Sequence, residues 1–358
     1  MNRRLVYDGV EHDIEPHETV LEALERHGRG VPSACRAGTC HSCLLQALDG
    51  DPGERARRGL KDTLRAAGYF LACQCHPAGD ITAGPPGGEL SAPARIASIG
   101  WLGHRTLDVR LTVEGEFSYS AGQFVTLLRP DLLARSYSLA SLPADGELRL
   151  HVRHHPGGAM SGWLADRAAP GDPVTVRGPY GTCFYVPGWP EQPLLLAGTG
   201  TGLAPLYGIL RDALRHGHSG PIRLVHGALD ARGLYLVSEL SELARAVPTL
   251  DYQRCVLAAD TDADAASGPS PKPSPESSSG PGPGGEVRVG DLVDVVTRLV
   301  PDPTGHRVFL CGDPDVTRTL QRRLFMNGAS NRDIHVDAFT PPASTTPTVP
   351  PGTPQATR

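Results

Sequence analysis

The chain has 358 residues, enough for two or three domains that each bury a core. Its net charge of −5, with acidic and basic residues interspersed, argues against an electrostatic nucleic-acid binder. No apolar run approaches the roughly 20 residues that span a membrane, and the N-terminus lacks the apolar core of a signal peptide. We therefore expect a cytoplasmic protein whose eight cysteines bind metal or take part in redox chemistry.

The first segment, residues 1–83, combines short strands with short helices, which predicts an α+β domain. One helix is expected because Val20, Leu21 and Leu24 form an apolar face. The expected elements are a strand over Leu5–Tyr7, a helix over Thr19–Arg26, a strand over Leu44–Ala47 and a helix over Leu60–Ala66. A run rich in glycine and proline then predicts a linker over residues 84–92.

The second segment, residues 93–190, alternates apolar with polar residues, and turns follow every ten residues or so. This pattern predicts an antiparallel β-barrel. The alternating apolar positions are Leu107, Val109, Leu111 and Val113 in one run, and Leu148, Leu150 and Val152 in another.

The third segment, residues 191–340, changes to short apolar runs separated by helical patterns, which is typical of an α/β domain with buried parallel strands. The expected strands are Leu194–Ala197, Ile222–Val225 and Val308–Cys311. Two stretches rich in proline, serine, glycine or threonine, Asp260–Gly285 and Pro341–Arg358, are expected to be disordered because they hold too little apolar surface to offset the entropy of ordering.

Four cysteines in the first segment have the spacing of an iron–sulfur site. Cys35, Cys40 and Cys43 form C-x4-C-x2-C, and Cys73 follows in Leu-Ala-Cys-Gln; this is plant-type [2Fe–2S] spacing. Gly38 leaves amide N–H groups free to point at cluster sulfurs. A structural zinc site is the alternative, but such sites more often use two C-x2-4-C pairs. Cys75 competes with Cys73 as the fourth ligand.

This segment resembles plant-type ferredoxin domains, which implies a β-grasp-like fold. In that family the cysteine before glutamine is the ligand, which favours Cys73 over Cys75. His41 stands where many members of the family carry glycine.

The second segment holds a possible flavin site. Arg135, Tyr137 and Ser138 form R-x-Y-S, and Gly158 and Ser161 follow in a glycine-rich turn that opens a helix over 161–167. An arginine neutralises a diphosphate, an aromatic ring stacks on a flavin, and free amides at a helix start bind phosphate. By itself, R-x-Y-S is more typical of an ordinary exposed strand with a salt-bridged arginine.

The third segment holds a possible nucleotide site. The strand over Leu194–Ala197 is followed by Gly-Thr-Gly-Thr-Gly, residues 198–202, and then by a helix, which together make an anion site. A tight turn without a ligand is the alternative. Cys311, Gly312 and Asp313 end a later strand at the same edge of the sheet, where α/β proteins bind ligands.

The order of these motifs, with Gly-Pro-Tyr-Gly at 178–181 between them, resembles the ferredoxin–NADP reductase superfamily over residues 95–339. The resemblance implies that Arg135, Tyr137 and Ser138 hold the flavin, and that Gly158 and Ser161 meet its pyrophosphate, so FAD is favoured over FMN. It makes Cys311, Tyr137 and Ser138 candidate catalytic residues. The candidate cofactor-binding residues are Arg135, Tyr137, Ser138, Val152, Gly158, Ser161, Gly198, Thr199, Gly200, Gly202, Asp230, Cys311, Gly312, Asp313 and Phe339.

Two charged residues leave the choice between NADH and NADPH open. Asp230 could accept hydrogen bonds from a ribose hydroxyl and would repel a 2′-phosphate, whereas Arg232 could do the opposite. The balance favours NADH.

The domain order resembles the reductase components of bacterial multicomponent oxygenases and CDP-6-deoxyglucoseen reductase. It implies an NAD(P)H-dependent oxidoreductase that uses FAD and a [2Fe–2S] cluster to pass electrons to a protein acceptor. The expected acceptor is a terminal oxygenase or hydroxylase; the alternatives are a deoxysugar dehydratase, another soluble acceptor, and a non-catalytic redox sensor. We expect a monomer.

Overall fold

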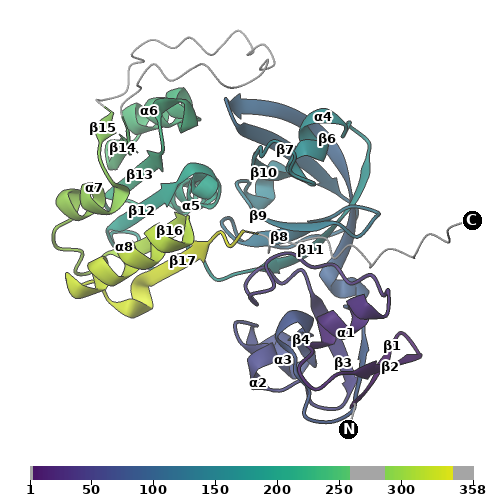
Figure 1. Cartoon of the computed structure of the whole chain (residues 1–358). Coiled ribbons are helices and arrows are strands. Elements are labelled where there is room, and N and C mark those ends of the chain that lie inside the picture. The colour runs from purple at the N-terminus through teal and green to yellow at the C-terminus, as the bar shows by residue number, and fades with distance from the viewer. Residues whose placement is uncertain (1–2, 259–286, 342–358) are drawn as a thin grey trace, which may run out of the picture.

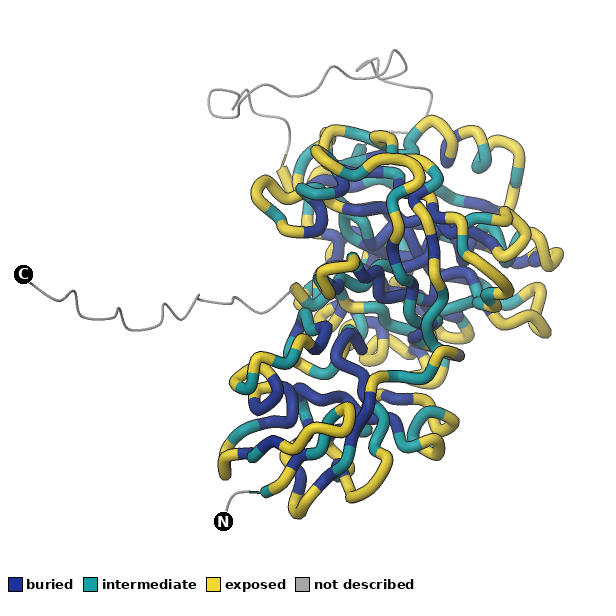
Figure 2. The backbone as a smooth tube through the Cα atoms, turned by 90° about the vertical axis from the view of Figure 1, so that its right-hand side faces the viewer, coloured by how far each residue is buried: buried dark blue, intermediate teal, exposed yellow. Residues whose placement is uncertain are grey.

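The computed structural model describes residues 3–258 and 287–341. They form three lobes that follow one another along the chain: a purple lobe at the bottom of Figure 1, a blue-to-teal lobe at the upper right, and a green-to-yellow lobe at the upper left. Each lobe contains one sheet and buried apolar residues of its own. Figure 2 shows buried stretches inside the lower lobe and inside the upper part, where the second and third lobes overlap in this view. The segments expected to be disordered lie outside the described residues, except for Pro341.

The first lobe is a mixed five-stranded sheet in the order β2-β1-β5-β3-β4, with β1 parallel to β5. Its elements are β1 Arg3–Tyr7, β2 Val10–Ile14, α1 Val20–Arg26, β3 Leu44–Asp49, α2 Glu54–Arg57, α3 Asp62–Ala66, β4 Tyr69–Leu71, the 3₁₀ turn η1 Ala72–Gln74 and β5 Ile81–Gly84. Thr19 and Glu22 cap α1 reciprocally, because each side chain accepts a hydrogen bond from the backbone amide of the other.

One helix in this lobe differs from the expectation. The helix expected over Leu60–Ala66 is α3, which begins two residues later at Asp62, and the short helix α2 before it was not expected. Gly59 lies between α2 and α3 with a φ of +80°, a left-handed conformation that glycine adopts easily and that separates the two helices. Of the expected linker, Gly84 ends β5, the 3₁₀ turn η2 covers Gly88–Leu90, and Ser91 begins the next strand.

The second lobe is an antiparallel sheet in the order β10-β7-β6-β11-β8-β9 that curls into an open barrel. Its edge strands β9 and β10 approach each other where Leu139 and Leu150 form an isolated bridge. Its elements are β6 Ser91–Gly103, β7 Thr106–Val113, β8 Phe124–Leu128, β9 Ala134–Ser138, η3 Pro143–Asp145, β10 Leu148–Arg153, α4 Ser161–Asp166 and β11 Pro173–Tyr180.

The third lobe is a parallel sheet in the order β15-β14-β13-β12-β16-β17. Helices α5 and α6 pack on one face of it, and α7 and α8 pack on the other. Its elements are β12 Leu194–Thr199, η4 Gly200–Gly202, α5 Leu203–Arg215, β13 Ile222–Ala228, η5 Ala231–Gly233, α6 Val237–Ala246, β14 Leu250–Val256, β15 Arg288–Val289, α7 Leu292–Leu299, β16 Arg307–Gly312, α8 Pro314–Met326, η6 Asn331–Asp333 and β17 Ile334–Ala338.

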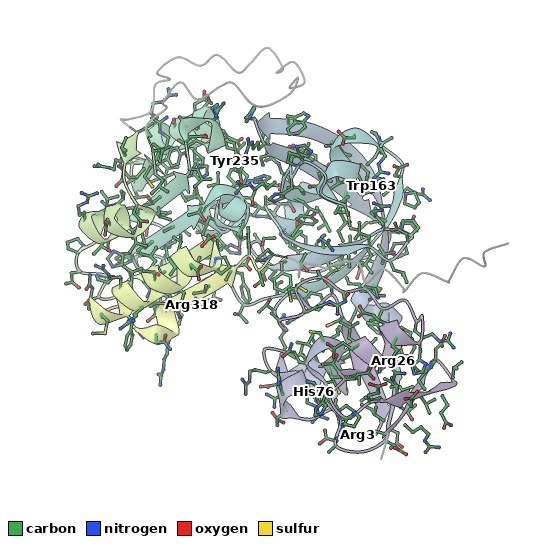
Figure 3. The ribbon with its side chains drawn as sticks, viewed as in Figure 1. Arg3, Arg26, His76, Trp163, Tyr235 and Arg318 are labelled. Atoms are coloured by element: carbon green, nitrogen blue, oxygen red, sulfur yellow. The ribbon has the colours of Figure 1, made fainter. Side chains whose placement is uncertain are left out.

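Polar contacts join the second and third lobes. Tyr235, labelled between them in Figure 3, places its hydroxyl 3.1 Å from Nδ1 of His151 on β10. Arg211 on α5 makes two hydrogen bonds of 2.8 Å with Asp145 in η3. These contacts join the barrel to the third lobe at α5 and at the segment between η5 and α6. Among the described residues, none of the helices combines the length and the hydrophobicity needed to cross a bilayer.

Candidate functional site

The four expected ligand cysteines meet at one end of the first lobe. Their thiols contact in two pairs, Cys35 with Cys40 and Cys43 with Cys73. A hydrogen bond from the Cys40 thiol lowers the pKa of Cys35 to about 4, and one from Cys43 lowers the pKa of Cys73 to about 7. Two sulfur pairs suit two irons that are each bound by two thiolates.

Backbone and side-chain donors surround these sulfurs. The Ala37 amide donates to Cys35 Sγ at 3.3 Å, and the Gly38 amide donates to Cys73. Gly38 has a φ of +80°, and a Cβ there would lie 2.9 Å from Gln74 Cγ, so only glycine fits this turn. Such donors stabilise negative charge on the sulfurs and would tune the potential of a bound cluster.

The competing candidate Cys75 lies apart from these pairs. Its side chain is fully buried, and its thiol donates to the carbonyl of Pro52 at 3.4 Å. Burial raises the pKa of Cys75 to about 12, which disfavours the thiolate that metal binding requires. The geometry therefore favours Cys73 as the fourth ligand.

A cavity of 1010 Å³ lies where the three lobes meet. The cysteine loop contributes Ala34, Thr39 and Cys40 to its wall, so a candidate cluster ligand borders the same space as the candidate flavin and nucleotide residues. The predicted site residues that line it are Arg135, Tyr137, Ser138, Gly158, Ser161, Thr199, Gly200, Asp230, Gly312, Asp313 and Phe339.

Four predicted site residues lie behind this wall. Val152 is buried in the barrel core. Gly198 and Gly202 pack against the backbone of Cys311: a Cβ on Gly202 would lie 2.3 Å from the Cys311 carbonyl oxygen. Cys311 itself is fully buried, with its sulfur 3.7 Å from that of Cys183. These positions shape the cavity through packing.

On the barrel side of the cavity, Arg135 has no ion pair among the residues that the structure describes; its Nη1 donates to the carbonyl of Ala134 at 2.7 Å. Its charge is therefore available to a diphosphate. A free amide was expected at Gly158. In the structure this amide instead donates to the carbonyl of His155 at 2.8 Å in a tight turn. Ser161 Oγ accepts from the His155 amide at 3.1 Å and starts α4, which ends one residue earlier than expected.

On the sheet side, β12 leads through η4 into α5, and Thr199, Gly200 and Thr201 line the cavity at that helix start. The Asp313 amide donates to Thr199 Oγ1 at 3.0 Å, and the Asp313 carboxylate caps α8. Asp230 caps η5 by accepting from the Gly233 amide at 3.0 Å. This arrangement offers amides and hydroxyls to a phosphate-bearing ligand.

Sequence reasoning did not single out Asp337, which the structure places in the cavity wall. Ser138 Oγ on β9 donates to Asp337 Oδ2 on β17 at 2.6 Å, and both line the cavity. Burial raises the pKa of Asp337 to about 6, although the bond from Ser138 opposes this. Asp337 lies opposite Cys311 on the neighbouring strand. The sequence signal was a carboxylate two residues before the candidate Phe339.

Comparison with known proteins agrees with this geometry. Family models match residues 6–78 as a 2Fe-2S iron-sulfur cluster binding domain, 94–185 as an oxidoreductase FAD-binding domain and 196–269 as an oxidoreductase NAD-binding domain. The reductase subunit of an aromatic O-demethylase from Amycolatopsis sp. is 35% identical, over 92% of this chain and 96% of that protein. A reductase component of the naphthalene 1,2-dioxygenase system of Pseudomonas putida is 29% identical, over 90% and 93%.

The solved structures agree as well. An Amycolatopsis cytochrome P450 reductase superimposes with a TM-score of 0.64 at 31% identity, covering 95% of this chain and 99% of that one. The fold and site thus define an electron-transfer flavoprotein with FAD, NAD(P)H and [2Fe–2S] sites. The chain belongs to the ferredoxin–NADP reductase-type family in which a plant-type ferredoxin is fused to FAD- and NAD-binding domains. It is an oxidoreductase.

Proposed function

We propose that the chain is the reductase component of an oxygenase system and that it passes electrons from NAD(P)H to a terminal oxygenase or hydroxylase. The supporting observation is the shared cavity, which borders the Cys40 loop, the flavin residues and the nucleotide turn together. The names of the relatives point to the acceptor class, since they are reductases of O-demethylase and dioxygenase systems. We propose that it works in the cytoplasm as a monomer. We also propose that its domain boundaries lie near residues 83 and 190.

FAD, when bound by the barrel residues, would supply the conversion between two-electron and one-electron chemistry that the chain needs, because nicotinamide donates two electrons at once and a [2Fe–2S] cluster takes one. Arg135 would neutralise the diphosphate of the flavin, and Tyr137 would stack on its ring. Cys35, Cys40, Cys43 and Cys73 would bind the irons. We propose that Ser138 and Asp337 orient the nicotinamide and that Asp337 holds a proton or releases it according to pH.

The proposed function is tested with the purified protein and two measurements. The absorption spectrum should show flavin and iron–sulfur bands, and the NADH-reduced protein should reduce the terminal oxygenase of the Amycolatopsis O-demethylase system. Zinc in place of iron, with no flavin bands, would overturn the oxidoreductase reading of the site. Full reduction by NADH without transfer to that oxygenase, to a Rieske-type dioxygenase or to a diiron hydroxylase would overturn the acceptor class.

The nucleotide preference is tested at Asp230. The carboxylate lines the cavity and lies 3.6 Å from Arg232, so it both repels a 2′-phosphate and partly neutralises the cation that would attract one. We expect a preference for NADH, and Asp230→Asn should raise kcat/KM for NADPH by roughly tenfold, or 1.4 kcal/mol, while changing the value for NADH less. Arg232→Gln is the matched control, which should lower NADPH use further. A wild-type preference for NADPH would contradict this assignment.

A further inference from the structure

The cysteine loop meets the barrel at two neighbouring residues. The first is Cys40, whose backbone carbonyl accepts a hydrogen bond from Ser136 Oγ at 2.7 Å and a longer one from Thr126 Oγ1 at 3.4 Å. Ser136 on β9 and Thr126 on β8 are partners in the strand register, and their hydroxyl oxygens lie 3.2 Å apart. One carbonyl of the loop is therefore held by two hydroxyls from adjacent strands of the barrel.

The second contact is the imidazole of His41. Its ring lies edge-on to the rings of Tyr180 and Phe124, with centroid separations of 4.9 and 5.6 Å. The side chain is only 8% exposed. Phe124 and Tyr180 come from β8 and β11 of the barrel, yet Tyr180 belongs to the same buried cluster as the core of the first lobe. The ring of His41 thus sits in an aromatic socket built by the neighbouring lobe.

The backbone conformation of His41 is independent evidence that contacts with the barrel hold this residue in place. His41 has a φ of +56°, in the left-handed region that non-glycine residues adopt at a cost in free energy. Such a conformation persists only where surrounding contacts hold it. The aromatic rings of the socket supply those contacts.

We propose that Cys40 and His41 form a two-point clamp that holds the cluster-binding loop against the flavin side of the cavity. In this view Ser136 and His41 are positioning residues for the electron transfer inside the chain. Lobes joined by a short connection move relative to each other unless their interface is well packed. Because Cys40 borders the cavity, loss of the clamp lengthens the path from the cavity to the cluster. The inference is independent of which acceptor the chain serves.

The test uses the full chain loaded with FAD and cluster. His41→Asn keeps a residue that tolerates the left-handed backbone but removes the ring, and Ser136→Ala removes the main hydroxyl. His41→Phe keeps an aromatic ring in the socket, and Ser219→Ala removes a surface hydroxyl far from the clamp. Amide hydrogen exchange is followed in residues 35–43 and in β8 and β9, and the cluster is followed by its electron paramagnetic resonance spectrum after rapid mixing with NADH.

We expect His41→Asn and Ser136→Ala to raise exchange at these amides by about tenfold, which corresponds to 1.4 kcal/mol in the docking equilibrium. Electrons should reach the cluster more slowly in both, with an unchanged spectrum of the reduced cluster. Ser219→Ala should stay close to the wild type, and His41→Phe should fall between the wild type and His41→Asn, because its ring fills the socket but its left-handed backbone is more strained. Unchanged protection in both test variants would overturn the clamp. If His41→Asn loses its cluster, Ser136→Ala decides alone.

Discussion

Cys73→Ser is expected to abolish the iron–sulfur bands while leaving NADH-driven ferricyanide reduction by the flavin nearly intact. Cys73 is paired with Cys43 and accepts an amide hydrogen bond from Gly38, so its loss leaves one iron with a single cysteine. The flavin residues lie in the other lobes and keep their contacts. Iron content and the absorption spectrum measure the loss of the cluster, and ferricyanide turnover measures the remaining flavin activity.

Cys75→Ser is the matched control because Cys75 lies two residues away and is buried as well. Its thiol bonds to the Pro52 carbonyl, and a serine hydroxyl can make the same bond. We expect a full complement of iron and unchanged transfer to cytochrome c. If Cys75→Ser loses the cluster and Cys73→Ser retains it, the ligand assignment is wrong.

Asp337→Asn is expected to remove a pH dependence that the wild type shows near pH 6. Burial raises the pKa of Asp337 from 3.8 to about 6, which corresponds to a cost of about 3 kcal/mol for ionising it in the folded chain. The unfolded chain gives up this proton near pH 4 and the folded chain near pH 6, so this group lowers stability as pH rises between them. Relative to the wild type, the asparagine variant should therefore gain stability between pH 4 and pH 7.

The same variant has a kinetic signature. Hydride leaves a nicotinamide ring that becomes positively charged, and a carboxylate in the cavity stabilises that charge in a low-dielectric site. Flavin reduction by NADH should rise as Asp337 ionises through pH 6 in the wild type and stay level in Asp337→Asn. Urea unfolding and stopped-flow reduction at a series of pH values measure both effects. Asp333→Asn, outside the cavity, is the control; equal pH profiles in all three proteins would contradict the role of Asp337.

The sequence predicted the type of each lobe because periodicity records burial. Strands buried on both faces, such as Leu194–Thr199, appear as unbroken apolar runs, and the alternation in Thr106–Val113 marks a strand with one face in the barrel core. Strand order left no such local mark, since it depends on which strands pair across the chain. Helix α2 was missed because its four residues, Glu54–Arg57, are too few to show the period of an apolar helical face.

The same distinction between local patterns and long-range contacts applies to the candidate site. Short motifs identified the residues around the cavity, because phosphate and metal binding demand particular residue types at fixed spacings. Asp337 became visible only through its approach to Ser138, which is 199 positions away along the chain. The socket of His41 was hidden for the same reason: Phe124 and Tyr180 belong to another lobe. Val152 and Gly202 show the converse, since their motif positions serve packing against neighbouring backbone.

The edge strands of the three sheets affect whether two copies of the chain can pair through their backbones. An edge strand offers unpaired amides and carbonyls on which a second copy can add a strand. Among the described residues, β15 covers only Arg288–Val289, and β4 covers only Tyr69–Leu71. The barrel edges β9 and β10 partly satisfy each other at Leu139 and Leu150. The opposite edges, β2 and β17, are each five residues long, so a second copy that added a strand to one of these two sheets would find more backbone groups there than at β4 or β15.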